Sequence, residues 1–199
     1  MTELLTIDTT EPTAIRVSSG TILDLLPEDN ILLHQPTKEF IFDSSEAKKI
    51  SNDLIATLKK YKAFGLSANQ CGIEYSIFVM GHEDNYITII NPKIIEQSNN
   101  IITMQEGCLS YPGLVLGINR PEYVVMKFTN INGEEVLQRF EGLTARIALH
   151  EFDHLHGITF NSKAKPLALK NGLKKREKHM KNLARHIVSS QKQLNLKKR

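Results

Sequence analysis

The clearest periodic pattern along the chain predicts a helix that begins at Ser44 or Ser45 and ends between Lys62 and Gly65. Its apolar residues recur at intervals of three or four positions and therefore share one face. These residues are Ile50, Leu54, Ile55 and Leu58. The pattern indicates an amphipathic helix with one buried side.

Short runs rich in β-branched and aromatic residues follow this helix and predict strands. The first three runs lie at 76–80, 86–90 and 101–104. Two more runs, 123–130 and 134–140, are joined through Asn132 and Gly133, which supply the positive φ angles of a tight hairpin turn. The middle of the chain is therefore expected to be mostly antiparallel sheet.

Two further helices are expected after the strands. One covers residues 143–156 and is ended by Gly157, which suits a left-handed C-terminal cap. The other covers about 172–192, with Leu173, Met180, Leu183, Ile187 and Val188 on one side. Helices and antiparallel strands together indicate an α+β fold. In it, antiparallel sheets pack around the helix at 143–156, and an N-terminal helix and a basic C-terminal helix are added to them.

Three regions of different composition divide the chain. Residues 1–30 mix polar, threonine-rich and proline-containing stretches without a sustained period, and are expected to be a lead-in or extension. Residues 31–165 contain the predicted core elements and are long enough for one domain. Residues 166–199 are expected to form a basic helix and tail.

The net charge of +3 conceals an uneven distribution. Residues 163–199 contain 13 lysines and arginines and the single acid Glu177, a net charge of +12. Residues 1–162 contain 12 bases and 21 acids, a net charge of −9. An acidic body therefore carries a basic C-terminal segment, and such a segment suits contact with RNA.

The composition argues against a membrane protein. The hydrophobic fraction of 41% and the charged fraction of 24% are ordinary for globular proteins. No run approaches the roughly 18 apolar residues that a membrane span needs, and the acids near the N-terminus do not suit a secretory signal. We therefore expect a cytoplasmic protein in which Cys71 and Cys108 stay reduced.

The segment His150-Glu151-Phe152-Asp153-His154 matches H-E-x-x-H within a predicted helix. Spacing of four residues places both imidazoles on one face, about one turn apart, so that they can bind one metal ion. Glu151 can then approach water at that ion and act as a general base. A polar surface helix with no metal is the alternative.

A catalytic metal site usually needs a third protein ligand, and Cys108 is the best candidate. Gly107 before it permits a sharp backbone path, and a metal would hold the sulfur as thiolate. The alternative is a buried core cysteine. A third segment, residues 65–70, places small residues before the side-chain amide of Gln70, and would by itself suit a plain turn.

Taken in order, these three segments resemble the signature motifs of the peptide deformylase family: G-x-G-x-A-A-x-Q, E-G-C-L-S and H-E-x-D-H. The second and third motifs match at every defining position, at 106–110 and 150–154. The resemblance spans roughly residues 30–165. It implies removal of the formyl group from the N-terminal formyl-methionine of nascent polypeptides, with release of formate.

The resemblance assigns three ligands to one divalent metal ion, namely Cys108, His150 and His154. The ion is usually Fe(II) in this family, and Zn, Ni or Co often replaces it. Glu151 would accept a proton from the attacking water and pass it to the departing amine. The Gln70 side-chain amide and the Leu109 backbone N–H would stabilise the oxyanion.

The resemblance also implies an apolar pocket for the methionine side chain. Family-like positions of this pocket are Phe64, Met104, Leu143 and Ile147, each of which would also suit a plain core. The backbone of Gly65 and of residues beside Cys108, among them Gly107, would bind the peptide as an extended strand. Arg146 stands where the family often has an aliphatic residue, and would narrow or recharge the pocket mouth.

Three other positions depart from the family pattern, and one further pair of residues is expected to support the site structurally. Ala63 replaces the leading glycine of the first motif, Ser67 replaces its first alanine, and Leu149 replaces a polar residue before His150. Asp153 is expected to pair with Arg120 as structural support, because an arginine at that distance beyond the cysteine is typical of the family.

Three partner and function hypotheses follow. The family can use its C-terminal helix to bind the ribosome, which suits the basic segment here. A zinc peptidase shares H-E-x-x-H, but most such enzymes take their third ligand downstream of the motif, whereas Cys108 lies upstream. A deformylase-like module that has lost turnover and binds the ribosome or nucleic acid is the non-enzyme alternative.

Overall fold

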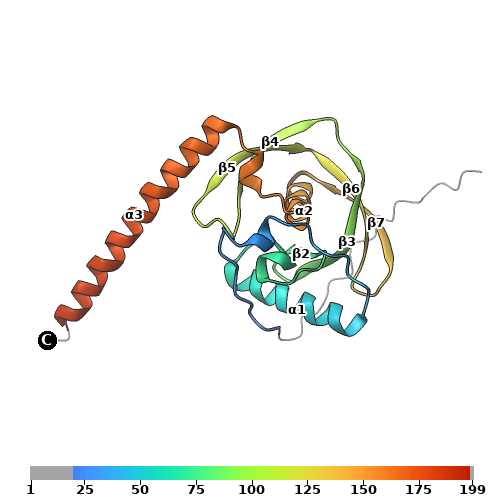
Figure 1. Cartoon of the computed structure of the whole chain (residues 1–199), viewed down its shortest axis with the longest axis horizontal. Coiled ribbons are helices and arrows are strands. Elements are labelled where there is room, and N and C mark those ends of the chain that lie inside the picture. Colours follow the sequence, from blue (N-terminus) through green and yellow to red (C-terminus); the bar gives the residue numbers. More distant parts are fainter. Residues whose placement is uncertain (1–19, 198–199) are drawn as a thin grey trace, which may run out of the picture.

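Two antiparallel sheets form the body of the molecule (Figure 1). The larger has the strand order β1-β2-β3-β6-β7, and the smaller pairs β4 with β5. This computed structural model describes residues 20–197, with side chains up to Arg185. The strands are β1 (Gly65–Ser67), β2 (Ile77–His82), β3 (Asn85–Gln97), β4 (Ile101–Gly107), β5 (Val115–Pro121), β6 (Tyr123–Thr129) and β7 (Glu135–Glu141).

Helix α1 (Ser44–Tyr61) confirms the first predicted helix. The Asp43 side chain accepts a hydrogen bond from the Glu46 N–H and caps the first turn, and Lys62 ends the helix in the left-handed region with φ +53°. Helix α2 (Gly142–Leu155) confirms the second, and Gly157 follows it at φ +70° as expected.

Strand β2 shows why its sequence is apolar at consecutive positions. Ile77 and Val79 lie in one core cluster with the buried residues of α1, whereas Phe78 and Met80 lie in a second cluster with residues of α2. Successive side chains of a strand point to opposite faces, so a strand covered on both faces loses its polar alternation. Helix α2 also packs against β1, β6 and β7 and against β5 of the smaller sheet.

The β6–β7 hairpin is confirmed, with Thr129 opposite Glu135, but its turn differs from the expected one. Only Gly133 has a positive φ angle, +87°, and Asn132 does not. The Asn130 side-chain oxygen instead accepts hydrogen bonds from the N–H groups of Asn132 and Glu134. The side chain of Asn130 therefore stabilises this turn through hydrogen bonds, and a second residue with a positive φ angle is not needed.

Helix α3 (Pro166–Lys197) begins six residues before the predicted start at 172 and continues past the predicted end at 192. Pro166 suits the first helical turn, where no N–H is needed. Gly172 lies inside the helix, where a Cβ atom would approach within 2.5 Å of Leu116 Cδ2. The glycine therefore lets α3 approach β5 before the helix extends away from the body (Figure 1).

The first described residues, Gly20 to Leu23, lie along α1. The Thr21 N–H donates to Asp53 Oδ1 at 2.7 Å, and the Leu23 N–H donates to Thr57 Oγ1 at 2.8 Å. The part of the lead-in that the structure describes is thus bonded to the body. The division of the chain at residues 30 and 165 stays a prediction.

Candidate active site

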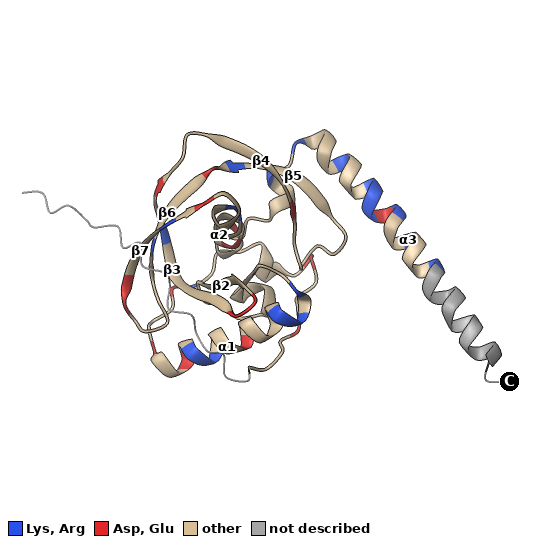
Figure 2. Ribbon diagram, turned by 180° about the vertical axis from the view of Figure 1, so that it is seen from behind, with Lys and Arg blue, Asp and Glu red and all other residues tan. Residues whose placement is uncertain are grey.

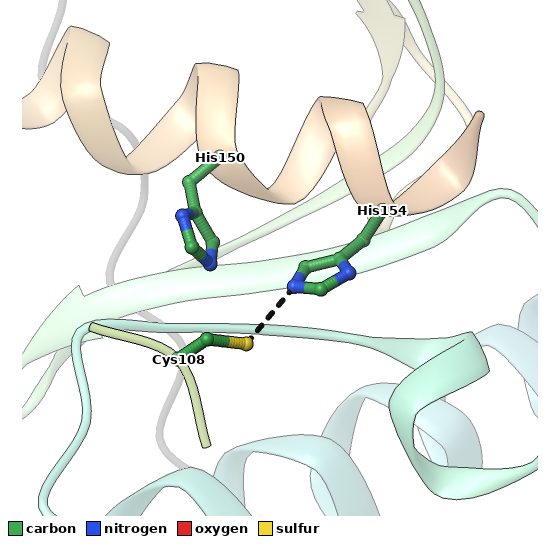
Figure 3. A group of neighbouring side chains, drawn as sticks. All are labelled: Cys108, His150 and His154. Carbon is green, nitrogen blue, oxygen red and sulfur yellow. Dashed lines mark hydrogen bonds between the residues drawn. The ribbon is translucent and has the colours of Figure 1, made fainter. Parts of the chain in front are cut away.

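Helix α2 presents two histidines toward the cysteine that follows β4 (Figure 3). His150 and His154 lie one turn apart on the same face, and Cys108 comes directly after Gly107, the last residue of β4. One ligand atom from each of the three residues lies within 4.8 Å of the others, and Cys108 Sγ is 3.2 Å from His154 Nε2. One sulfur and two imidazoles at such separations suit a single divalent cation of the zinc or iron type.

Glu106 fixes the orientation of His150. Its Oε2 atom lies 2.9 Å from His150 Nδ1, which leaves Nε2 as the nitrogen directed to the ligand group. Arg120 donates to both carboxylate oxygens of Glu106, at 2.6 and 2.9 Å, and Arg146 donates to one at 2.8 Å. Burial alone would raise the pKa of Glu106, but hydrogen bonds from His150 and Arg120 outweigh it and hold that pKa far below its usual range.

The two histidines differ in how readily they hold a proton. Burial disfavours a charged His150, yet hydrogen bonds with Cys108 and Glu106 outweigh burial and raise its pKa to about 10. Burial and the neighbouring His150 together lower the pKa of His154 well below its usual value. The thiol and the carboxylates around His150 thus stabilise a positive charge there. A metal ion bound at this position would take the place of the proton on His150.

Glu151 lies beside this group with one oxygen free. Its Oε2 atom is buried and has no hydrogen-bond partner among residues 20–185. Burial raises the pKa of Glu151 to about 7, because the charged carboxylate is poorly solvated there. A carboxyl group with a pKa near neutrality can both accept and donate a proton at physiological pH.

Strand β1 brings the backbone of Gly65 against Glu151. A Cβ atom at Gly65 would lie 2.5 Å from Glu151 Oε1 and 2.8 Å from Ile147 Cγ2, so any larger residue would displace these side chains. Gln70 follows in the short 3-10 helix η2 (Ala68–Cys71), and its Nε2 atom lies 3.0 Å from Ser110 Oγ and 3.4 Å from Cys108 Sγ. Its amide N–H groups therefore face the ligand group.

A cavity of about 660 Å³ opens next to these residues. Of the residues predicted to bind substrate or stabilise the oxyanion, it is lined by Phe64, Gly65, Gln70, Gly107, Leu109, Leu143, Arg146 and Ile147. Phe64 and Leu143 are about half exposed, as residues at a mouth would be. The cavity wall also includes Leu25 and residues 111–115, which the sequence did not single out.

Two expectations about the cavity need comment. Met104 is not among the residues that line it, and its place in the methionine pocket stays a prediction. Arg146 lines the cavity but does not recharge its mouth. Its guanidinium is buried, donating to Glu106 and to the carbonyl oxygens of Ile118 and Ile102.

Comparison with known proteins agrees with the motifs. The family model described as polypeptide deformylase matches residues 22–170. The chain belongs to the polypeptide deformylase family. Like other deformylases it acts on nascent formylated peptides, removing the N-terminal formyl group.

Curated relatives support this membership. The peptide deformylase of Thermotoga neapolitana is 38% identical over 125 residues, which cover 63% of this chain and 76% of the relative. Peptide deformylase 1 of Bacillus anthracis is 34% identical over 144 residues, covering 71% of this chain and 92% of the relative.

Solved deformylase structures have the same fold. The peptide deformylase of Synechococcus elongatus, solved in complex with actinonin, superposes with a TM-score of 0.76 at 33% identity, covering 84% of this chain and 95% of that one. The enzyme of Thermotoga maritima gives a TM-score of 0.70 at 32% identity, covering 73% and 99%. Antiparallel sheets with helices are therefore shared with these deformylases.

Supporting residues of this deformylase were only partly predicted. Arg120 bonds Asp153 at 2.6 Å, which confirms the expected pair, but the central position of Glu106 between Arg120, Arg146 and His150 was missed. The E-G-C-L-S motif contains Glu106 and Ser110, so membership in that motif was the available signal. Within residues 20–197, no helix is both long and apolar enough to cross a bilayer.

Proposed function

We propose that Cys108, His150 and His154 hold the catalytic divalent metal ion of this deformylase, on a helix α2 that lies at the centre of the sheets. Fe(II) is the ion we expect, with Zn, Ni or Co as replacements. When bound, such an ion polarises the formyl carbonyl as a Lewis acid and lowers the pKa of water at the site. The proposal is supported by the convergence of the three donor atoms within 4.8 Å.

We further propose that Glu151 moves the proton. Its unpartnered, buried Oε2 atom accepts a proton from the water that attacks the formyl carbon. As the C–N bond breaks, the same carboxyl group donates that proton to the departing amine. Formate and a free N-terminal methionine are the products, and Glu151 returns to its starting state.

Two donors are proposed to stabilise the oxygen that becomes negative during attack. The Gln70 Nε2 group already faces Cys108, and the Leu109 N–H comes from the residue directly after that ligand. The Gln70 carbonyl oxygen accepts from both the N–H and the hydroxyl of Ser67, at 3.0 Å each, which keeps the amide N–H groups directed to the site.

The substrate methionine is proposed to enter the cavity between β1, the end of β4 and α2. Ile147, Leu143 and Phe64 supply apolar surface there, and the backbone of Gly65 and Gly107 borders the cavity on two sides. A peptide bound as an extended strand between these backbones would be held through main-chain groups, which tolerates varied residues after methionine.

The test is formate release from formyl-Met-Ala-Ser by protein purified without oxygen and loaded with Fe(II). Wild type should release formate, and Glu151→Gln should lose at least about 10²-fold in kcat while binding the same amount of metal. Full metal occupancy without formate release by the wild type would favour the inactive binding module. Cleavage of an unformylated peptide at an internal bond would favour the zinc peptidase.

We also propose that this cytoplasmic enzyme contacts the ribosome through α3. Figure 2 shows lysines and arginines along the part of α3 that projects from the body. Lys174, Lys178 and Arg185 are exposed there, as binding to phosphates requires. Replacing these three by glutamate should abolish salt-dependent cosedimentation with ribosomes, and unchanged cosedimentation would refute the contact.

A further inference from the structure

Arg176 differs from its neighbours on α3 because it turns toward the body. Its side chain is 19% exposed, whereas Lys174, Lys175 and Glu177 are exposed. Arg176 Nε donates to the carbonyl oxygen of Pro112 at 2.9 Å, and Nη2 lies 2.8 Å from Glu28 Oε2. One guanidinium thus joins three segments that are far apart in the sequence.

Both segments that Arg176 holds border the substrate cavity. Residues 111–115 line it directly, next to Cys108 and Leu109. Leu25, three residues before Glu28, lines it as well, and the Leu26 N–H donates to the carbonyl oxygen of Gln70 at 2.8 Å. Arg176 itself is not among the residues that line the cavity.

The contact around Arg176 is packed as well as hydrogen-bonded. Gly113 has φ +77°, and a Cβ atom there would lie 3.7 Å from Arg176 Cγ, 3.8 Å from His179 Cδ2 and 4.0 Å from Met180 Sδ. The turn at Pro112 and Gly113 therefore rests on one face of α3, which approaches β5 closely at Gly172.

We propose that Arg176 is a positioning residue for substrate binding: it clamps the cavity wall at 111–115 to α3 and to the segment that carries Glu28. This inference rests on the proposed use of the cavity for substrate. A charged donor bound to a backbone carbonyl restricts the motion of a turn. If the cavity wall is already ordered, peptide binding does not have to include the free-energy cost of ordering it.

The clamp is expected to act on binding and not on chemistry. Arg176 touches neither Glu151 nor Gln70, so the proton transfers and the oxyanion donors are unchanged without it. Because a partly exposed ion pair adds little to global stability, its loss should leave the protein folded. The expected signature is therefore a higher KM at nearly constant kcat.

The experiment compares Arg176→Met with Lys175→Met in the full-length, metal-loaded enzyme. Both variants remove one positive charge from α3, but only the first removes the clamp. For formyl-Met-Ala-Ser, Arg176→Met should raise KM about three- to tenfold with kcat within about twofold of wild type. Lys175→Met should match wild type. An unchanged KM in Arg176→Met, or an equal rise in both variants, would overturn the proposal.

Hydrogen exchange measured by mass spectrometry provides a readout that does not depend on turnover. Backbone amides of residues 109–115 and 21–29 should exchange faster in Arg176→Met than in wild type, while those of β6 and β7 should not change. Equal exchange at 109–115 in both proteins would refute the clamp even if KM changed. If wild type released no formate, the proposed function would fail and the exchange data would still decide the clamp.

Discussion

The carboxylate of Glu106 accepts hydrogen bonds from His150, Arg120 and Arg146 at a position that is only 5% exposed. Two guanidinium groups keep it ionised, and an ionised carboxylate holds the Nδ1–H of the imidazole. The other nitrogen of His150 is thereby directed to Cys108 and His154. One buried anion thus sets the tautomer of a proposed metal ligand, an effect that H-E-x-x-H alone does not specify.

Ser67 stands where the family motif has alanine, and its hydroxyl donates to the Gln70 carbonyl oxygen at 3.0 Å. In Ser67→Ala the backbone N–H of residue 67 still holds that oxygen, so one of the two hydrogen bonds to it is lost, together with the Ser67 side-chain contact to Glu151. We expect kcat to fall about two- to fivefold, set against roughly 10²-fold for Gln70→Ala. Steady-state formate release measures both, and an unchanged kcat in Ser67→Ala would contradict this role.

Cys71 is expected to be an unreactive thiol. Burial, aided by the negative charge of Glu151, raises its pKa to about 12, so at pH 8 it carries far less thiolate than a free cysteine. Alkylation by iodoacetamide at pH 8 should be roughly 10³-fold slower than for an unstructured peptide cysteine. Peptide mapping separates Cys71 from Cys108, and the same protein in guanidinium serves as control. Rapid labelling of folded Cys71 would contradict the raised pKa.

Among the elements, β1 and α2 meet where Gly65 faces Glu151. In Gly65→Ala the new methyl group would displace the Glu151 carboxylate and Ile147, both of which are side-chain atoms that can move. We expect kcat to fall by at least about tenfold with little change in melting temperature. Gly117→Ala is the control, since a Cβ atom there makes only ordinary contacts at 3.5 Å. Equal activity in the two variants would exclude close contact at Gly65.

Strands β4 and β5 are joined to α2 by buried charges. Arg120 is 2% exposed, and bonds Glu106 on β4 and Asp153 on α2. Arg120→Met removes one partner from each of the two carboxylates. Arg146 still contacts Glu106, and Lys163 still contacts Asp153. The free energy of unfolding should fall by about 3 kcal/mol in a guanidinium titration. Arg139→Met, an exposed arginine on β7, should change it by less than about 0.5 kcal/mol. Similar values for both would refute the network.

For the molecule as a whole, we expect the core to stay folded when metal is removed. The apolar clusters on both faces of the larger sheet include none of the three proposed metal ligands, and the His154 carbonyl oxygen is held by Asn69 at 2.7 Å. Removing metal with a chelator should therefore keep the far-UV circular dichroism spectrum and lower the melting temperature. The free energy of unfolding should be about 3 kcal/mol lower than that of protein with free metal at 100 times Kd. Unfolding on chelation would show that the metal is part of the core.

Much of the fold was predictable because residues close together in the sequence determine where its helices and its hairpin form. α1, α2 and the β6–β7 hairpin were predicted from spacing and turn residues, and the structure confirms them. The start of α3 was predicted at 172, six residues too late. Gly172 lies inside this helix and permits a close approach to Leu116, a contact that no local pattern reveals.

By itself the sequence determined the helix that carries His150, Glu151 and His154, the three family motifs, and the basic character of the C-terminal segment. Only the tertiary structure decided that Cys108 meets His154 across 46 positions and that Arg146 is buried against Glu106. The hydrogen bond from Arg176 to Pro112 was likewise revealed only by the tertiary structure. The physical reason is that periodicity and turn chemistry act within a few residues, whereas these contacts depend on how finished elements pack together.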